Sequence, residues 1–322
     1  MKAIVHYKYG APDVLELKNI DKPAAKDKEV LVRVHAAAVN AADWHLVRGL
    51  PYIMRMAMGL LKPKNIVRGG DVAGRVEAVG KDAKQFRPGD EVFAEVDTGS
   101  FAEYVCVSED LLGLKPANLT FEQAAAIPLA ANTALQGLRD RGQVQPGQRV
   151  LINGAAGGVG TFAVQIAKSF GADVTGVCST RNVDMVRSIG ADHVIDYTQE
   201  DFTQSGQRYD LVFDLVGNRS LSDCRGALTP KGTLLLSSGH GGRWLGPIGR
   251  IIKALLLSPF VSQRLRPLVA TSSKENLVVL KELVESGKVT PVIERTYPLS
   301  EVPEAIRYLE EGHAQGKVVI AV

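Results

Sequence analysis

From residue 149 to residue 162 the chain reads Arg149-Val150-Leu151-Ile152-Asn153-Gly154-Ala155-Ala156-Gly157-Gly158-Val159-Gly160-Thr161-Phe162. The apolar run 149–153 predicts a buried β-strand, and the apolar periodicity from about residue 158 to residue 170 predicts a helix. Small residues in the turn between them would let the backbone approach a pyrophosphate, and the helix N-terminus offers unpaired N–H groups. We therefore expect a dinucleotide phosphate to contact Ala155, Gly157, Gly158, Val159 and Gly160. Ala155 stands where the usual motif has its first glycine, so a tight turn that binds nothing is the alternative.

A second nucleotide signal follows the next predicted strand, 173–178. Enzymes that use NAD place an acidic residue there, about 20 residues after the glycine loop, to bind the ribose hydroxyls. Here the chain reads Ser179-Thr180-Arg181, with no carboxylate. Hydroxyls and a guanidinium suit a 2′-phosphate, so NADPH is favoured over NADH. Tyr197, at the end of the third strand, is expected beside the same phosphate; the alternatives are an exposed arginine at a helix start and a tyrosine at the sheet rim.

On either side of about residue 121, the sequence predicts two different patterns of secondary structure. From about residue 121 to 271, strand-like and helix-like segments alternate, which predicts βαβ units and a parallel sheet covered on both faces. The predicted strands are 149–153, 173–178, 193–197, 210–216, 232–237 and 268–271, and the predicted helices are 121–141, 158–170, 182–189 and 220–228. From residue 1 to about 120, short apolar runs cut by Gly, Pro and Asp predict antiparallel strands, including 29–34, 72–79, 90–94 and 102–107. After residue 272 we expect helices at 274–286 and 300–311 and strands at 291–293 and 317–322.

Composition excludes several classes of protein. The length of 322 residues suggests about two domains. With 45% apolar residues, 23% charged residues and a formal charge of +3, the chain is typical of a globular protein and carries no electrostatic footprint for nucleic acid. Cys106, Cys178 and Cys224 are far apart, so neither a disulfide framework nor a cysteine zinc site is predicted. No signal-peptide core and no membrane-spanning run is visible, and a cytoplasmic location is expected.

Besides the glycine loop and the residues after the next strand, the sequence contains four further motifs. They are Val39-Asn40-Ala41-Ala42-Asp43-Trp44-His45, Asp71-Val72-Ala73-Gly74-Arg75-Val76-Glu77-Ala78-Val79-Gly80, Pro128-Leu129-Ala130-Ala131-Asn132-Thr133-Ala134 and Gly316-Lys317-Val318-Val319-Ile320. Together they resemble the medium-chain dehydrogenase/reductase superfamily, and most of all its zinc-free quinone oxidoreductases, the zeta-crystallin-like and reticulon-4-interacting-protein-like group. The resemblance implies an α/β fold in which a doubly wound Rossmann sheet, residues 123–271, is inserted into a GroES-like, mainly-β catalytic domain, residues 1–122 and 272–322. It also implies NADPH as the cofactor and a homodimer joined through the last Rossmann strand, near 268–271.

The resemblance also bears on metal dependence. Zinc members have a cysteine at the position of Asn40 and a Gly-His-Glu at the position of 69–71, which here reads Gly-Gly-Asp. The lobe of four closely spaced cysteines is missing as well. Because tetrahedral zinc needs converging thiolate, imidazole or carboxylate ligands, we expect no metal.

Without a Lewis acid, the expected reaction is hydride transfer from NADPH to a quinone or to the β-carbon of an α,β-unsaturated carbonyl. The resemblance places the substrate near Asn40, Asp43, His45 and Tyr52. Asn40 would donate a hydrogen bond to substrate or ribose, Asp43 would orient the loop or a water, and His45 or Tyr52 would donate a proton. The alternatives are a turn residue for Asn40, a helix N-cap for Asp43 and rim positions without an essential role for His45 and Tyr52.

Further cofactor contacts are expected where strands end at the carboxyl edge of the sheet. The family pattern adds Thr133 on the nicotinamide ribose, and the expected set is Thr133, Val216, Gly217, Ser238, Gly239 and Lys317. A capping hydroxyl is the alternative for Thr133, and an exposed lysine on a terminal strand is the alternative for Lys317.

Two apolar segments, 46–64 and 244–266, are punctuated by single basic residues. They are interpreted as ordinary packing helices or a dimer contact, as a lid over a lipophilic substrate, or, least favoured, as an amphipathic patch for a membrane surface. The leading hypothesis for the whole chain is an NADPH-dependent, zinc-independent quinone or enone reductase that takes a small lipophilic substrate. An NADPH-binding protein with an interaction or structural role and an alcohol dehydrogenase-type enzyme are the alternatives.

Overall fold

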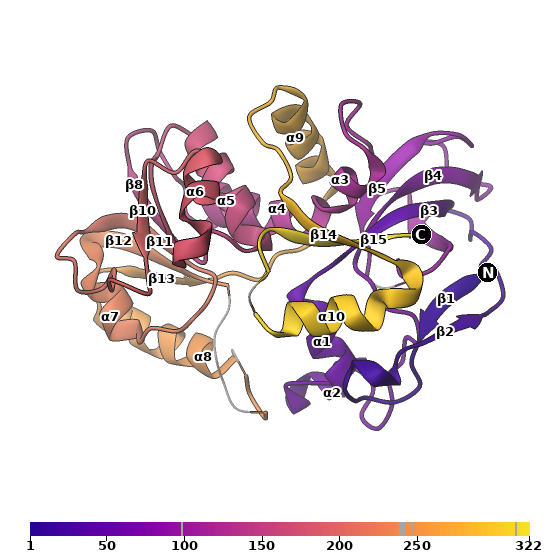
Figure 1. Ribbon diagram of the computed structural model, residues 1–322, viewed down its shortest axis with the longest axis horizontal. Helices are drawn as coiled ribbons and strands as arrows, with labels where there is room; N and C mark the ends of the chain where they lie inside the picture. Colours follow the sequence, from indigo (N-terminus) through magenta and orange to yellow (C-terminus); the bar gives the residue numbers. More distant parts are fainter. Residues whose placement is uncertain (98, 238–242, 247, 313) are drawn as a thin grey trace. The chain divides into compact units, whose positions relative to one another are not determined.

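The computed structural model (Figure 1) describes residues 1–322 except 98, 238–242, 247 and 313. These residues form two compact units: one comprises 1–132, 272–287 and 291–322, and the other comprises 133–271 and 288–290. The first unit therefore reaches ten residues beyond the expected boundary at residue 122. Its extension is held by side chains, because Asp71 accepts the backbone N–H of Leu129 and Asn276 donates to Asn132.

The first unit is built on a seven-stranded sheet of order β14-β15-β3-β4-β5-β7, with β6 paired to β3. Its strands are β3 (Glu29–Val39), β4 (Asp71–Val79), β5 (Glu91–Glu95), β6 (Tyr104–Ser108), β7 (Gly113–Leu114), β14 (Ile293–Pro298) and β15 (Lys317–Ala321), and a separate hairpin pairs β1 (Lys2–Val5) with β2 (Glu16–Asn19). Its helices are η1 (Pro12–Val14), α1 (Ala41–Arg48), η2 (Tyr52–Met54), α2 (Arg55–Met58), α3 (Phe121–Ala125), α9 (Lys274–Glu285), η6 (Leu299–Glu301) and α10 (Val302–Glu310). The unit boundary falls inside α4 (Pro128–Leu135).

Strand β15 joins the two ends of the chain in this unit. It runs antiparallel to β3, with Val318 opposite Val39 and Ala321 opposite Ala36, and parallel to β14 on its other side. Each of Val318, Val319 and Ile320 is fully buried. The C-terminal strand is thus an inner strand of the sheet, and the expected mainly-β domain contains both ends of the chain, with one parallel strand pair, β14 and β15.

The second unit is a doubly wound, six-stranded parallel sheet of order β10-β9-β8-β11-β12-β13. Its strands are β8 (Arg149–Asn153), β9 (Asp173–Cys178), β10 (His193–Asp196), β11 (Tyr209–Asp214), β12 (Leu228–Leu236) and β13 (Arg264–Pro267). Its helices are η3 (Gln136–Arg141, a π-helical turn), α5 (Gly158–Ser169), η4 (Thr180–Asn182), α6 (Val183–Ser188), α7 (Leu221–Gly226), α8 (Ile248–Leu257) and η5 (Ser258–Phe260). In Figure 1, α5 and α6 cover one face of the sheet, and α7 and α8 cover the other.

The core beneath α7 and α8 explains why these helices lie there. Leu151, Val212 and Leu234 point from neighbouring strands toward Cys224 of α7 and Ala254 of α8, and all are buried in one cluster. Continuous apolar runs in the inner strands cover both faces of the sheet, as expected for a buried parallel sheet.

Three predicted elements were placed wrongly, and one of them, the strand expected at 291–293, is β14 at Ile293–Pro298. The last strand of the parallel sheet is β13 at 264–267, not 268–271. It is an edge strand in which Leu265 is buried between Arg264 and Arg266, so it lacks the apolar run by which inner strands are recognised. The predicted helix 121–141 is interrupted between α3 and α4, because Pro128 has no N–H to continue a helix. From α4 the chain passes directly into the π-helical turn η3.

None of the helices among the described residues is both long enough and apolar enough to cross a membrane.

Candidate functional site

A buried polar cluster lies in the first unit where β3 ends and α1 begins. Asn40 is the N-cap residue of α1, and its side chain joins Asp71, the first residue of β4, to Lys317, the first residue of β15. Lys317 Nζ donates to Asn40 Oδ1 at 2.5 Å and lies 3.1 Å from Asp71 Oδ2. All three side chains are buried. Three strands that are adjacent in the sheet thus bring one amide, one carboxylate and one ammonium together.

The Asn40 amide is already engaged within this cluster. Its Nδ2 lies 2.9 Å from Asp71 Oδ2 and 3.4 Å from the carbonyl oxygen of Ala38. An amide nitrogen carries two hydrogens, so both point toward acceptors inside the unit. The expected donation from Asn40 to a substrate therefore stays a prediction, and it would require one of these bonds to be exchanged.

Asp43 is the third residue of α1, and its carboxylate accepts the backbone N–H of Asn40 at 2.8 Å. The alternative for Asp43 was the helix N-cap itself, but the N-cap is Asn40, and Asp43 completes the cap from the third helical position. Burial raises the pKa of Asp43 to about 7, with a further rise from the neighbouring Asp71, while the Asn40 N–H, Lys317 and Arg68 act in the opposite direction. Asp43 can therefore bind or release a proton near neutral pH.

Sequence reasoning missed three members of this region: Asp71, Arg68 and His6. Arg68 Nε donates to His6 Nε2 at 2.8 Å, and both side chains are buried. Burial and the Arg68 charge lower the pKa of His6 to about 4, so its imidazole is neutral at neutral pH. No spacing in the sequence could reveal the group, because its members come from distant strands and loops.

His45 and Tyr52 have neighbours of their own. His45 is half-buried on α1, and its ring stacks on that of Trp44 with 3.5 Å between centroids. Burial lowers the pKa of His45. Tyr52 begins η2, and the Arg55 guanidinium lies 4.8 Å from its ring centroid. Both residues lie on the segment that follows β3, and their expected contact with a substrate remains a prediction.

In the second unit, the glycine loop joins β8 to α5 as predicted. Gly160 is demanded by the fold, because a Cβ there would lie 2.0 Å from the carbonyl oxygen of Gly154. Gly157 differs: it is the N-cap of α5, and the nearest atom to a Cβ there would be 3.6 Å away. Packing within the protein therefore leaves the space above Gly157 open. An open backbone at the N-terminus of a helix fits the phosphates of a dinucleotide.

The departure at Ala155 has a structural compensation. Ala155 is fully buried. On the neighbouring strand β9 stands Gly176, where a Cβ would come within 3.0 Å of the Ala155 Cβ and 2.6 Å of Val186 Cγ1. The methyl group that Ala155 adds to the loop is thus accommodated by a missing side chain on β9.

The ends of β9 and β10 carry the predicted 2′-phosphate residues. These strands pair in parallel, with Asp196 opposite Cys178, so Ser179 and Tyr197 leave the sheet at the same edge. Arg181 lies in η4 and is exposed, and Tyr197 is also exposed. Their position and chemistry fit a phosphate.

A carboxylate that the sequence analysis did not consider stands at this edge. Asp196 accepts a hydrogen bond from Thr180 Oγ1 at 2.6 Å, and the backbone and hydroxyl of Thr198 donate to its other oxygen. These bonds, led by that of Thr180, lower the pKa of Asp196. The Thr180 hydroxyl therefore has an internal acceptor, which leaves Ser179, Arg181 and Tyr197 as the stronger candidates for phosphate contact.

The Asp214 carboxylate, at the end of β11, accepts hydrogen bonds from the end of β8 and from the loop that follows β11. Its Oδ1 accepts hydrogen bonds from Asn153 Nδ2 at 2.9 Å and from the backbone N–H of Gly217 at 2.9 Å. The backbone N–H of Val216 donates to the same oxygen at 3.2 Å. Its other oxygen pairs with Arg250 of α8 at 2.6 Å. Val216 and Gly217, both predicted cofactor contacts, are thus held by Asp214, whose role the sequence did not reveal.

The remaining predicted residues are placed as follows. Thr133 is buried in α4, and Lys317 is buried in the first unit, not exposed on a terminal strand. Ser238 and Gly239 lie outside the described residues.

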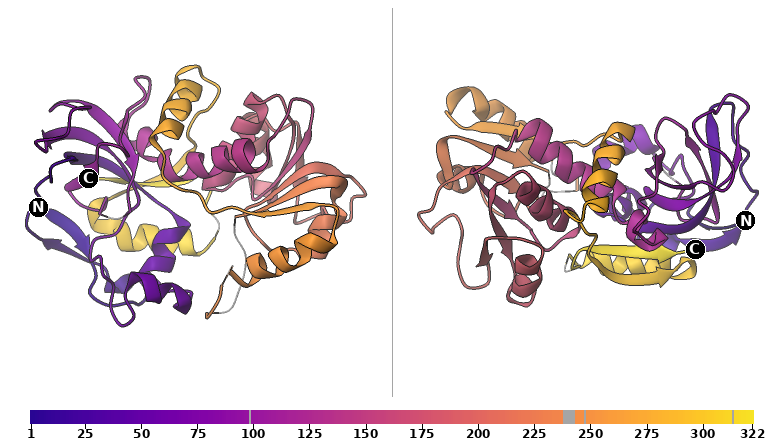
Figure 2. Two further views of the ribbon diagram at one scale, coloured as in Figure 1. Left: turned by 180° about the vertical axis from the view of Figure 1, so that it is seen from behind. Right: turned by 90° about the horizontal axis from the view of Figure 1, so that it is seen from above.

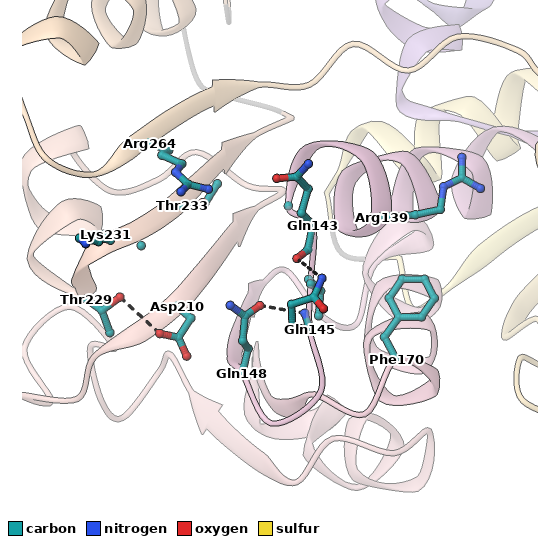
Figure 3. Close-up of a pocket in the computed structure, with 13 residues that line it drawn as sticks. Arg139, Gln143, Gln145, Gln148, Phe170, Asp210, Thr229, Lys231, Thr233 and Arg264 are labelled. Carbon is teal, nitrogen blue, oxygen red and sulfur yellow. Dashed lines mark hydrogen bonds between the residues drawn. The ribbon is translucent and has the colours of Figure 1, made fainter.

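A pocket of about 770 Å³ lies at the opposite edge of the parallel sheet (Figure 3). Asp210, Thr229 and Arg264, near the starts of β11, β12 and β13, line it together with Gln143, Gln145 and Gln148. None of the predicted site residues that the structure describes lines this pocket. It is therefore separate from the carboxyl edge that carries the glycine loop.

The described part of the chain contains no group of three or more His, Cys, Asp or Glu side chains that could hold a metal ion. The sequence nevertheless matches the model of a family described as zinc-binding dehydrogenase over residues 189–320, and that of the alcohol dehydrogenase GroES-like domain over residues 26–117.

Curated relatives cover nearly the whole chain. The chain is 38% identical to the NADPH-dependent alkenal/one oxidoreductase, chloroplastic, of Arabidopsis thaliana over 99% of its own length and 79% of the relative. It is also 38% identical to the human NAD(P)H oxidoreductase RTN4IP1, mitochondrial, over 100% of this chain and 89% of the relative. The solved quinone oxidoreductase of Coxiella burnetii is 33% identical, with a TM-score of 0.88 and coverage of 100% and 99%. On these matches, the chain belongs to the medium-chain dehydrogenase/reductase superfamily, in its quinone oxidoreductase branch.

Proposed function

We propose that the protein is an NADPH-dependent reductase of quinones and α,β-unsaturated carbonyl compounds, and that it works without zinc. The observation that carries the proposal is the nucleotide edge of the second unit. There, Gly157 leaves the N-terminus of α5 open, β9 ends in Ser179-Thr180-Arg181, and the Asp196 carboxylate at the end of β10 accepts hydrogen bonds from Thr180 and Thr198. The names of the relatives, an NADPH-dependent alkenal/one oxidoreductase and a quinone oxidoreductase, agree with this edge.

Each part of the edge has a task. The N–H groups at the start of α5 bind the pyrophosphate. Arg181, with Ser179 and Tyr197, holds the 2′-phosphate through charge-assisted bonds. Asp214 fixes the backbone of Val216 and Gly217, against which the nicotinamide half would lie. When bound, NADPH supplies the hydride for the electrophilic carbon of the acceptor.

The first unit supplies charge and a proton site. Lys317 places an ammonium beside Asn40, the position at which zinc members carry a ligand cysteine. Asp43, whose pKa burial raises to about 7, can hold the proton that must accompany hydride uptake. His45 and Tyr52 are the other proposed donors.

We further propose that the chain acts in the cytoplasm as a homodimer on small lipophilic substrates. The open edge strand β13 is the proposed contact between the two copies. Sedimentation velocity of the purified protein tests the dimer, and cell fractionation tests the location. A monomer at micromolar concentration would contradict the first of these.

The function is tested by NADPH oxidation with trans-2-alkenals, cyclic enones, o-quinones and p-quinones, with NADH in parallel. We expect turnover of at least one acceptor class, a preference for NADPH, and no loss of activity after dialysis against a chelator. Tight NADPH binding without turnover of any acceptor would favour a binding or structural role, and activity restored only by added zinc would contradict the zinc-independent reaction.

A further inference from the structure

Basic residues are in excess over acidic residues in the part of the sequence that contains α8. Between Asp223 and Glu275 there is no acidic residue at all. The same stretch holds eight basic residues: Arg225, Lys231, Arg243, Arg250, Lys253, Arg264, Arg266 and Lys274. Because the whole chain carries only +3, the rest of the chain is net acidic. A segment of this composition is attracted to anionic surfaces.

The same stretch exposes large apolar side chains. Trp244 is 74% exposed, Leu256 is 69% exposed and Phe260 is 83% exposed. Leu245, Ile252 and Leu255 are exposed too. We call these six residues, together with the exposed Arg243 and Lys253, the α8 face. Water-exposed apolar groups gathered on one short segment mark an interaction surface more often than chance exposure.

The helix that carries this face is firmly attached to its unit. On its inner side, Ala254 is fully buried, and Leu257 packs against the same core. Arg250 pairs with Asp214 at 2.6 Å and also donates to the carbonyl oxygen of Arg219 at 3.1 Å. In Figure 2 the helix lies along the outside of the sheet of its own unit. The apolar row at 252, 255 and 256 is thus held outward while the opposite side of α8 is fixed.

Charge distinguishes between the partners that could cover this face. A symmetric contact between two copies would place the same patch opposite itself, so that Arg243 and Lys253 of each copy would face like charges. An anionic lipid surface instead attracts both residues. Trp at the interface, Leu and Ile below it and Lys or Arg around it are the composition of helices that lie in the plane of a membrane.

We propose that the α8 face docks on an anionic lipid bilayer, with α8 in the membrane plane and Trp244, Leu256 and Phe260 in the interface. This inference goes beyond the proposed function, since NADPH-dependent reduction of a soluble acceptor needs no membrane. Docking would bring the enzyme to the phase in which lipophilic quinones and lipid-derived alkenals dissolve.

The test uses the full chain with NADPH and two kinds of vesicle, phosphatidylcholine alone and phosphatidylcholine with phosphatidylglycerol. We expect co-sedimentation with the anionic vesicles that weakens as salt is added. Binding by Leu255→Gln/Leu256→Gln and by Arg243→Gln/Lys253→Gln should fall roughly tenfold or more, the latter because each basic residue near the surface adds to the attraction. The matched controls Leu114→Gln/Val278→Gln and Lys26→Gln/Arg87→Gln replace exposed apolar and basic residues elsewhere and should bind like the parent.

Trp244 gives an independent readout. The chain has two tryptophans, Trp44 and Trp244, so Trp44→Phe leaves Trp244 as the only tryptophan, which is excited selectively at about 295 nm in the absence of NADPH. Its emission should shift to the blue with anionic vesicles. Equal binding to both kinds of vesicle, binding unchanged by the two α8 variants, or loss of self-association in those variants without vesicle binding would each overturn the proposal. NADPH oxidation in solution, measured on the same variants, reports separately on the proposed function.

Discussion

Arg250 and Asp214 form an ion pair in which the carboxylate is fully buried and the guanidinium is only 10% exposed. The two residues come from different parts of the unit, the first turn of α8 and the end of β11. Because Asp214 also receives the Asn153 amide and the Gly217 N–H, one carboxylate connects α8 to the loops after β8 and β11. Arg250 is therefore a positioning residue for the nucleotide edge.

Replacing this cation should be costly. Arg250→Met leaves Asp214 buried without its partner, and losing one member of a buried pair costs about 3–5 kcal/mol. We expect a lower free energy of unfolding in urea and weaker NADPH binding. The double variant Asp214→Asn/Arg250→Met removes the unpaired charge and should recover much of the stability. A double variant that is no more stable than the single one would contradict the pairing argument.

The glycine loop allows fold and ligand effects to be separated. In Gly160→Ala the added Cβ meets the carbonyl oxygen of Gly154, so we expect a loss of roughly 1–3 kcal/mol in stability. Gly157→Ala meets nothing closer than 3.6 Å in the protein. It should unfold near the parent temperature but bind NADPH more weakly, because the methyl group occupies the approach to the backbone. Differential scanning calorimetry and NADPH fluorescence titration check both. Normal NADPH affinity in Gly157→Ala would remove the loop from the phosphate site.

Arg181 should determine the choice between the two cofactors. Arg181→Ala removes the guanidinium proposed for the 2′-phosphate, and the loss of a charge-assisted contact corresponds to about 1.5–3 kcal/mol, or roughly 10- to 100-fold in NADPH affinity. NADH affinity should be nearly unchanged. Arg187→Ala is the matched control, since Arg187 is an exposed arginine of the following helix, α6. Equal losses for NADPH and NADH would contradict the assignment.

Asp43 predicts the pH dependence of stability. Its folded pKa is raised to about 7, above its value in the unfolded chain. The folded state therefore binds this proton more tightly, and its contribution to stability is lost as pH rises from about 4 to about 7. Asp43→Asn cannot ionise, so the fall in unfolding free energy over this range should be smaller than in the parent. Urea unfolding at pH 5 and pH 8 measures the change in unfolding free energy between the two pH values. The same change in the parent and in Asp43→Asn would disprove the assignment.

Local patterns were sufficient for the elements of the nucleotide-binding sheet. Strands β8 and β9 have the predicted bounds, because inner parallel strands are continuous apolar runs between turn residues. The position of the edge strand β13 was not predicted, because its arginines alternate with Leu265 and give no apolar run. The polar clusters were not predicted for another reason. Asp71 and Lys317 are 246 positions apart in the sequence, and only the order of the strands in the sheet brings them together. Motif positions such as Asn40 could be named as candidate site residues from the sequence, but their hydrogen-bond partners could not.

The position of β15 has a consequence for how the chain is made. Synthesis proceeds from the N-terminus at about 5–20 residues per second, so β3, β4 and β5 leave the ribosome long before residues 317–321. Until then, the edge of β3 at 36–39 has no strand to pair with, and Asp71 lacks the ammonium of Lys317. Residues 133–271 form a sheet without any later strand. The nascent nucleotide-binding unit can thus form first, while residues 1–132, made earlier, keep an unpaired strand edge, a site prone to aggregation, until β15 has been synthesised.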